Sequence, residues 1–107
     1  MAYKFSKGTR GLGDITFEED PDTGIDFEAD TIKLETGGAE RLVVTNTGVG
    51  INTGSPVTLL HINGTTDSSL SNHGLLVLGP TNSTNMTIDQ NEIIARNNGA
   101  ESTLYLQ

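Results

Sequence analysis

The sequence predicts an all-β fold, and three features of its patterning carry that prediction. Apolar and polar residues alternate in short runs with a period of two, the period of a half-buried strand. Turn-forming pairs such as Asn63-Gly64 and Asn98-Gly99 separate these runs, about one every ten residues. No window keeps apolar residues at the helical spacing of i, i+3, i+4 and i+7 together with good helix formers.

The expected strands follow one another closely along the chain. In order they cover residues 15–17, 25–27, 32–34, 41–45, 57–62, 75–78, 86–88, 92–96 and 103–106. Asp20-Pro21 and Asp30-Thr31 are expected in connections, and Gly79-Pro80 marks another. Proline cannot donate to a strand ladder and Asn-Gly favours a positive φ, so both kinds of pair end strands.

The composition predicts a core that one copy cannot complete. Hydrophobic residues make up 34% of the 107 and aromatic residues 5%, which is lean for a monomer of this length. No aromatic residue lies between Phe27 and Tyr105, so Leu, Ile and Val must fill a narrow interior. We therefore expect an elongated, interleaved homotrimer of the β-prism or triple-stranded β-helix type. The composition supports association of copies more strongly than it fixes the number three.

Charge is distributed unevenly near the N-terminus. Residues 1–13 carry three basic residues and no acid, whereas residues 14–30 carry eight acids and no base. The basic stretch is expected to be a flexible arm whose two aromatic residues, two positions apart, can add as a strand to a partner's sheet. The candidate anchor residues of this arm are Tyr3, Lys4, Phe5, Lys7 and Arg10. Within the acidic stretch, residues 20–24 imitate the start of a calcium loop but favour a solvated acidic turn.

Several function classes are disfavoured by the sequence. The net charge of -8 argues against a nucleic-acid partner, and no apolar run is long enough for a membrane-spanning helix. The chain has no cysteine, and neither His61 nor His73 has a catalytic motif around it. Three copies of His61 on a threefold axis could surround a metal ion, but a packed or surface histidine is favoured. We therefore expect no enzymatic activity, no cofactor and no metal. Alternation places His61 with Leu59, on the side opposite Leu60 and Ile62.

One stretch resembles a module that recurs in bacteriophage tail fibres. It comprises Glu40-Arg41-Leu42-Val43-Val44-Thr45-Asn46-Thr47-Gly48-Val49-Gly50-Ile51, then Ser55-Pro56 and Leu60-His61-Ile62-Asn63-Gly64. The usual Asn between the residues at 48 and 49 is missing, and Asn52 replaces a Gly. Residues 22–34, leading into 37–41, and residues 96–107 are similar to further segments in fibres of aquatic phages.

The resemblance implies an organisation in four parts. These are a basic arm (1–13), an acidic β-rich segment (14–39), a fibre-repeat module (40–64) and further shaft strands (65–107), truncated at Gln107 relative to similar fibres. It also implies a structural protein of the phage tail, extracellular once assembled. The arm would attach it to a tail or baseplate protein, and a distal region outside this chain would bind the host receptor. A capsid-bound fibre or decoration trimer, and a bacterial adhesin or carbohydrate-binding module, remain alternatives.

The module suggests which side chains face a shared axis. Gly48 and Gly50 permit close backbone approach, and Val49 and Ile51 alternate with them toward one side. The candidate trimer core consists of Ile32, Leu34, Val49, Ile51, Leu60 and Ile62.

Overall fold

The computed structural model describes residues 14–107, which form ten strands and no helix. The predicted all-β class is therefore confirmed for this part of the chain. Residues 1–13, with the proposed anchor positions, lie outside the described residues. The chain divides into two compact units, Met1–Ile62 and Asn63–Gln107, and each is described by itself.

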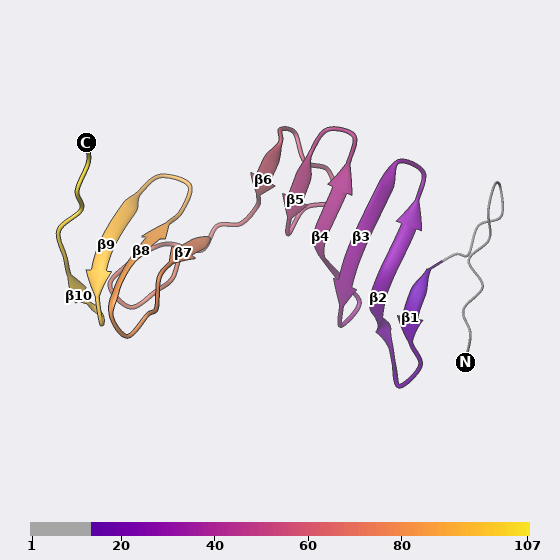
Figure 1. Cartoon of the computed structure of the whole chain (residues 1–107), viewed down its shortest axis with the longest axis horizontal. Coiled ribbons are helices and arrows are strands. Elements are labelled where there is room, and N and C mark those ends of the chain that lie inside the picture. The colour runs from indigo at the N-terminus through magenta and orange to yellow at the C-terminus, as the bar shows by residue number, and fades with distance from the viewer. Residues whose placement is uncertain (1–13) are drawn as a thin grey trace. The chain divides into compact units, whose positions relative to one another are not determined.

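The first unit contains one six-stranded sheet in which the strands lie side by side in chain order (Figure 1). Neighbouring strands are antiparallel from β1 to β5, whereas β6 runs parallel to β5. The strands are β1 (Ile15–Phe17), β2 (Asp20–Glu28), β3 (Thr31–Thr36), β4 (Ala39–Thr45), β5 (Val49–Ile51) and β6 (Leu60–Ile62). Asp20-Pro21 begins β2 rather than lying in a connection, so that prediction was wrong.

A short crossover between β5 and β6 replaces the first half of the strand predicted at 57–62. Residues 52–59 join these two parallel strands, fewer than the dozen that such a connection usually needs. The amide of Val49 donates to the carbonyl of Leu59 at 2.9 Å, which holds the returning chain beside β5. A Cβ at position 48 would collide with the main-chain oxygens of Thr58 and Leu59, so this close approach requires Gly48.

The second unit contains a four-stranded antiparallel sheet in the order β10-β9-β8-β7. Its strands are β7 (Leu76–Leu78), β8 (Thr84–Ile88), β9 (Ile93–Asn97) and β10 (Ala100–Glu101). Asn98 and Gly99 both have positive φ, which confirms the predicted Asn-Gly turn. The strand predicted at 103–106 is wrong, because Ser102 makes the last ladder bond, to Ala95, and Tyr105 is 81% exposed.

A buried arginine organises one side of the second sheet. Arg96 is only 1% exposed, and all five of its N–H groups have acceptors. Its Nε and Nη2 donate to Oδ1 of Asn85 at 2.9 and 2.7 Å, and Nη1 donates to the carbonyls of Ser69 and Asn72. The remaining Nη2 hydrogen reaches Nδ1 of His73 at 3.1 Å. These bonds fasten residues 69–73 across β8 and β9.

We predict that Arg96→Met destabilises the second unit by about 2–5 kcal/mol, because it removes the donors from several buried acceptors. Chemical denaturation should show the loss, and hydrogen exchange should place it in β8 and β9. Arg41→Met is the matched control, since Arg41 is exposed and its guanidinium donates to the hydroxyl and carbonyl of Thr36, and it should change stability by less than about 0.5 kcal/mol. Equal losses in both variants would contradict a special role for the buried guanidinium.

Candidate self-association surface

One face of the first sheet consists of two rows of apolar side chains that cross its strands. Directly paired residues share a face, so the strand registers define each row. The first row is Ile15, Ile25, Leu34, Leu42, Ile51 and Ile62. The second row is Phe27, Ile32, Val44, Val49 and Leu60. We call these eleven residues the first apolar face; none of them is charged.

No side chain of the first apolar face is buried by its own chain. Leu60 is 58% exposed, Phe27 46% and Ile32 43%, and the less exposed members are only half-buried. A hollow of about 340 Å³ is lined by Phe27, Ile32 and Val44 and by polar residues of the β2–β3 turn and the end of β4. An apolar surface that crosses a whole sheet and is left open is the usual mark of an interaction site.

All six residues predicted for the trimer core lie on the first apolar face. Ile32 and Leu34 come from β3, Val49 and Ile51 from β5, and Leu60 and Ile62 from β6, and the last four pair directly across the parallel strands. The structure thus brings the six together on one surface. That they meet an axis of symmetry stays a prediction.

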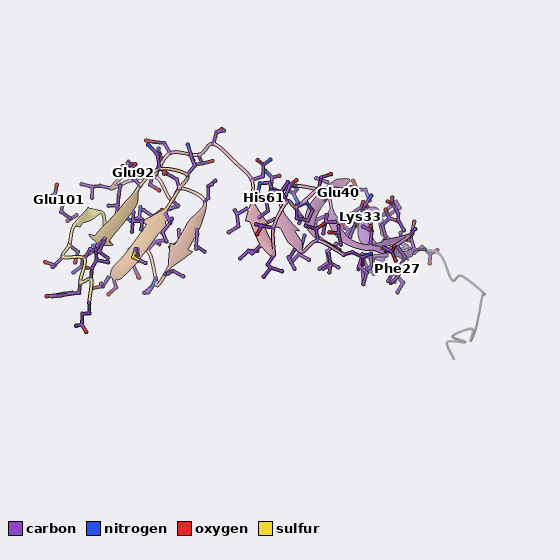
Figure 2. The ribbon with its side chains drawn as sticks, turned by 90° about the horizontal axis from the view of Figure 1, so that it is seen from above. Phe27, Lys33, Glu40, His61, Glu92 and Glu101 are labelled. Carbon is purple, nitrogen blue, oxygen red and sulfur yellow. The ribbon has the colours of Figure 1, made fainter. Side chains whose placement is uncertain are left out.

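The opposite face is polar, and the chain covers part of it. Lys33 lies there at the centre of an ion-pair group, with its Nζ 2.7 Å from Glu28, 3.1 Å from Glu40 and 3.7 Å from Asp26. Figure 2 shows Lys33 and Glu40 on one side of the sheet and Phe27 on the other. Beside them, Val43 is the one hydrophobic side chain among residues 14–107 that is fully buried.

Glycines at positions 50 and 54 allow the crossover to cover part of this polar side. A Cβ at position 50 would collide with Thr53, and one at position 54 would lie 2.7 Å from a carboxylate oxygen of Glu40. Residues 52–59 therefore pack against the polar face, where Pro56 is also buried. The crossover leaves the first apolar face uncovered, because it lies on the other side of the sheet.

Carboxyl groups crowd the N-terminal end of the polar face. Asp26 and Asp14 share a hydrogen bond, which raises the pKa of Asp26 above its ordinary 3.8; desolvation and the charge of Asp14 act in the same direction. Hydrogen bonds with Glu28 and Glu40 raise the pKa of Lys33, so this amine stays charged. The end of the sheet therefore combines one well-paired cation with a carboxyl pair that repels itself at neutral pH.

His61 lies on the polar face, opposite Leu60 and Ile62, as the alternation predicts. It pairs with Gly50, and both sit in the same row as Lys33. Its Nδ1 is buried and has no hydrogen-bond partner among the described residues. Because His61 points away from the first apolar face, copies that met through that face would not bring their His61 rings together.

Three acidic residues of the second unit lie close together. Asp67, Asp89 and Glu92 have carboxylate oxygens within 4.8 Å of one another. The Asp89 carboxylate, however, already accepts main-chain hydrogen bonds from Asn91, Ser68 and Glu92, which lower its pKa. We interpret the group as a turn that fixes residue 68 to the loop before β9.

Comparison with known protein families, curated proteins and solved structures finds no match to this chain. Residues 14–107 also contain no helix long and apolar enough to cross a membrane.

The predicted core omitted Leu42 and Val44 of β4 and also the part of the first apolar face at the β1–β2 end. Ile15, Ile25 and Phe27 continue the two rows there. The signal was present, because 25 and 27 alternate just as 32 and 34 do across a two-residue turn. Outside the fibre-repeat module (40–64), the predicted core included only Ile32 and Leu34.

We predict that Asp26→Asn raises the melting temperature at pH 7, because it removes the repulsion between Asp26 and Asp14. A carboxyl whose folded pKa is raised destabilises the fold fully above that pKa, and the penalty disappears as pH falls toward the unfolded value of 3.8. The native chain should therefore gain stability from this pair on mild acidification, and the variant should gain less. Thermal melts between pH 7 and about 4 measure both effects.

Asp30→Asn is the control for charge removal alone, since Asp30 occupies the exposed turn after β2 with a positive φ that Asn tolerates. A melting profile of Asp26→Asn that coincides with that of Asp30→Asn at every pH would contradict the paired-carboxyl account.

Proposed function

We propose that this protein is a non-enzymatic structural component of a phage tail fibre. In this proposal three copies associate through the first apolar face to form part of the fibre shaft. The arm at residues 1–13 attaches the shaft to a tail or baseplate protein, and a distal region outside this chain contacts the host receptor. The observation that carries the proposal is the open face of eleven apolar side chains on a sheet whose polar side is the one that the chain partly covers.

The energetics favour association through this face. Full burial of one such side chain is worth roughly 1.5–3 kcal/mol, and about half of that remains to be gained where the side chain is half exposed. Summed over the first apolar face, association offers on the order of 10 kcal/mol per chain, which is comparable with the stability of a whole domain. Even after the cost of bringing chains together, an interface of this size supports a stable assembly.

The partner that fits best is a second copy of the same face. Around a rotation axis each residue lies near its own symmetry mates, so a charged residue there would meet an identical charge. The first apolar face has no charged member, whereas the polar face holds Lys33, Glu28, Glu40 and Asp26. The proposed axis therefore lies on the apolar side, and the acidic side faces solvent.

We predict that Val49→Asp dissociates or aggregates the assembly, because it places an unpaired charge inside the proposed shared core. Light scattering after size exclusion should give three times the 11.3 kDa chain mass for the native protein and should lose that species in the variant. Val57→Asp is the matched control, since Val57 is 77% exposed on the crossover and belongs to neither row. A native mass of 11.3 kDa that persists on concentration, or a trimer in the Val49→Asp variant, would overturn the proposal.

The second prediction concerns attachment. Deletion of residues 1–13 should leave the assembly mass and melting temperature unchanged, because the described sheets begin after this stretch. The truncated protein should fail to copurify with phage particles, and a full-length variant with Lys4, Lys7 and Arg10 changed to Gln should copurify weakly. Incorporation at the native level would exclude the arm as the anchor, and attachment to tailless capsids would assign the protein to the capsid instead.

A further inference from the structure

The hollow at the end of the first apolar face differs from the rest of that face. Phe27, Ile32 and Val44 line it with apolar side chains that are 46%, 43% and 37% exposed. Its other lining residues are polar and include the carboxylates of Glu28 and Asp30, but no basic side chain. The hollow therefore combines apolar surface with an acidic rim.

The acidic rim makes a second copy of the hollow a poor occupant. Around a rotation axis through the hollow, each carboxylate of the rim would meet an identical carboxylate. Glu28 is paired with Lys33 at 2.7 Å, whereas Asp30 makes no ion pair with any of residues 14–107. The hollow therefore fits a segment that carries basic side chains beside apolar ones.

The chain itself contains one such segment, at residues 1–13. This stretch holds three of the six basic residues of the chain, no acid, and the aromatic rings of Tyr3 and Phe5. Lys4 lies between the two rings, so positive charge is placed directly beside them. The other three basic residues of the chain stand singly in the sequence. No other segment of this chain matches the hollow in both apolar and charged character.

The same segment joins the described sheet directly beside the hollow. Asp14 is the first described residue, and its Oδ1 accepts a hydrogen bond from the main-chain amide of Phe27 at 3.1 Å. Phe5 precedes Asp14 by nine positions, which span up to about 30 Å, and neighbouring strands lie about 4.8 Å apart. Three glycines within these positions permit a turn back toward the sheet. Both rings can therefore reach the hollow on β2, β3 and β4.

We propose that residues 1–13 dock on the sheet of their own chain, with the rings of Tyr3 and Phe5 in the hollow and the basic side chains at its rim. The inference goes beyond the proposed function and holds whether or not copies associate. One consequence does rest on the proposed function. Docked rings are hidden from other partners until a tail or baseplate protein displaces them.

The contact is expected to be weak and exchangeable. Linkage through a few residues gives an effective concentration in the millimolar range, which supports a contact too weak to form between separate molecules. A segment that is docked about half of the time changes the folding equilibrium by only about twofold. This is too little to alter the result expected for the melting temperature of the chain without residues 1–13.

Disulfide trapping in the full chain tests the inference, because the native protein has no cysteine. Ser6→Cys keeps both rings and every charge of the segment, and Asn46→Cys adds a thiol at an exposed residue that lines the hollow. Ser6→Cys with Glu19→Cys is the control pair, because Glu19 is exposed in the β1–β2 turn, at the other end of β2. Position 19 is nearer to position 6 in the sequence than position 46 is, so random collisions favour the control.

We expect oxidised glutathione to close the intrachain Ser6→Cys, Asn46→Cys disulfide about tenfold faster than the control disulfide, because docking holds the two thiols close together. The readout is a product of monomer mass on non-reducing electrophoresis. High salt should slow its formation by screening the rim. Replacing Tyr3 and Phe5 with Ser in the same background should reduce the rate to that of the control.

Equal rates for the two pairs, or a fast rate that persists without the two rings, would overturn the docking. A product of dimer mass from the Asn46→Cys pair would place the segment on another copy and would overturn docking on its own sheet. Light scattering separates this inference from the proposed function. A trimer with equal trapping rates would leave the proposed function standing, whereas a native chain of 11.3 kDa with fast trapping would overturn the trimer and support the docking.

Discussion

In both units the chain covers polar surface of the sheet and leaves the apolar surface open. The rest of this structure depends on that constraint. In most globular domains the chain's own segments bury the apolar face of a sheet, and water covers the polar face. Here the crossover at 52–59 lies over the side that holds Lys33, and the loop before β7 lies over the side that holds Arg96. Within each unit, the described segments cover the polar side of the sheet and leave its apolar side exposed.

Lys33 and Arg96 lie on the covered sides of the two sheets, and their positive charges are compensated in different ways. Lys33 of β3 is paired with three carboxylates, two from β2 and one from β4, so charge neutralises charge across the three strands. Arg96 has no carboxylate among its hydrogen-bond partners, and its charge is distributed over carbonyls, an amide oxygen and an imidazole nitrogen. Such a group is costly to bury but demands one geometry, because every N–H must find its acceptor.

Sequence patterning predicted the β class and most strands because a period of two directly reports which residues share a face. It placed Ile32, Leu34, Val49, Ile51, Leu60 and Ile62 as candidates, and the register puts all six on one face. It could not place the crossover, since residues 57–59 also alternate and only their approach to Gly48 keeps them out of the sheet. It also missed the Arg96 group, because its partners Ser69, Asn72 and Asn85 are distant in sequence and carry no local signal.

Contacts on the polar sides of the sheets also determine which side chains lie on the apolar sides. A slip of one residue in any strand pair would move its apolar side chains to the opposite face. Cross-strand pairs alone would resist such a slip weakly, because Leu, Ile and Val pack almost as well against one neighbour as against another. Lys33 and Arg96 do discriminate, since a slip would separate Lys33 from Glu40 and Arg96 from Asn85. The buried polar groups thus fix the register, and the register keeps the two open faces free of charge.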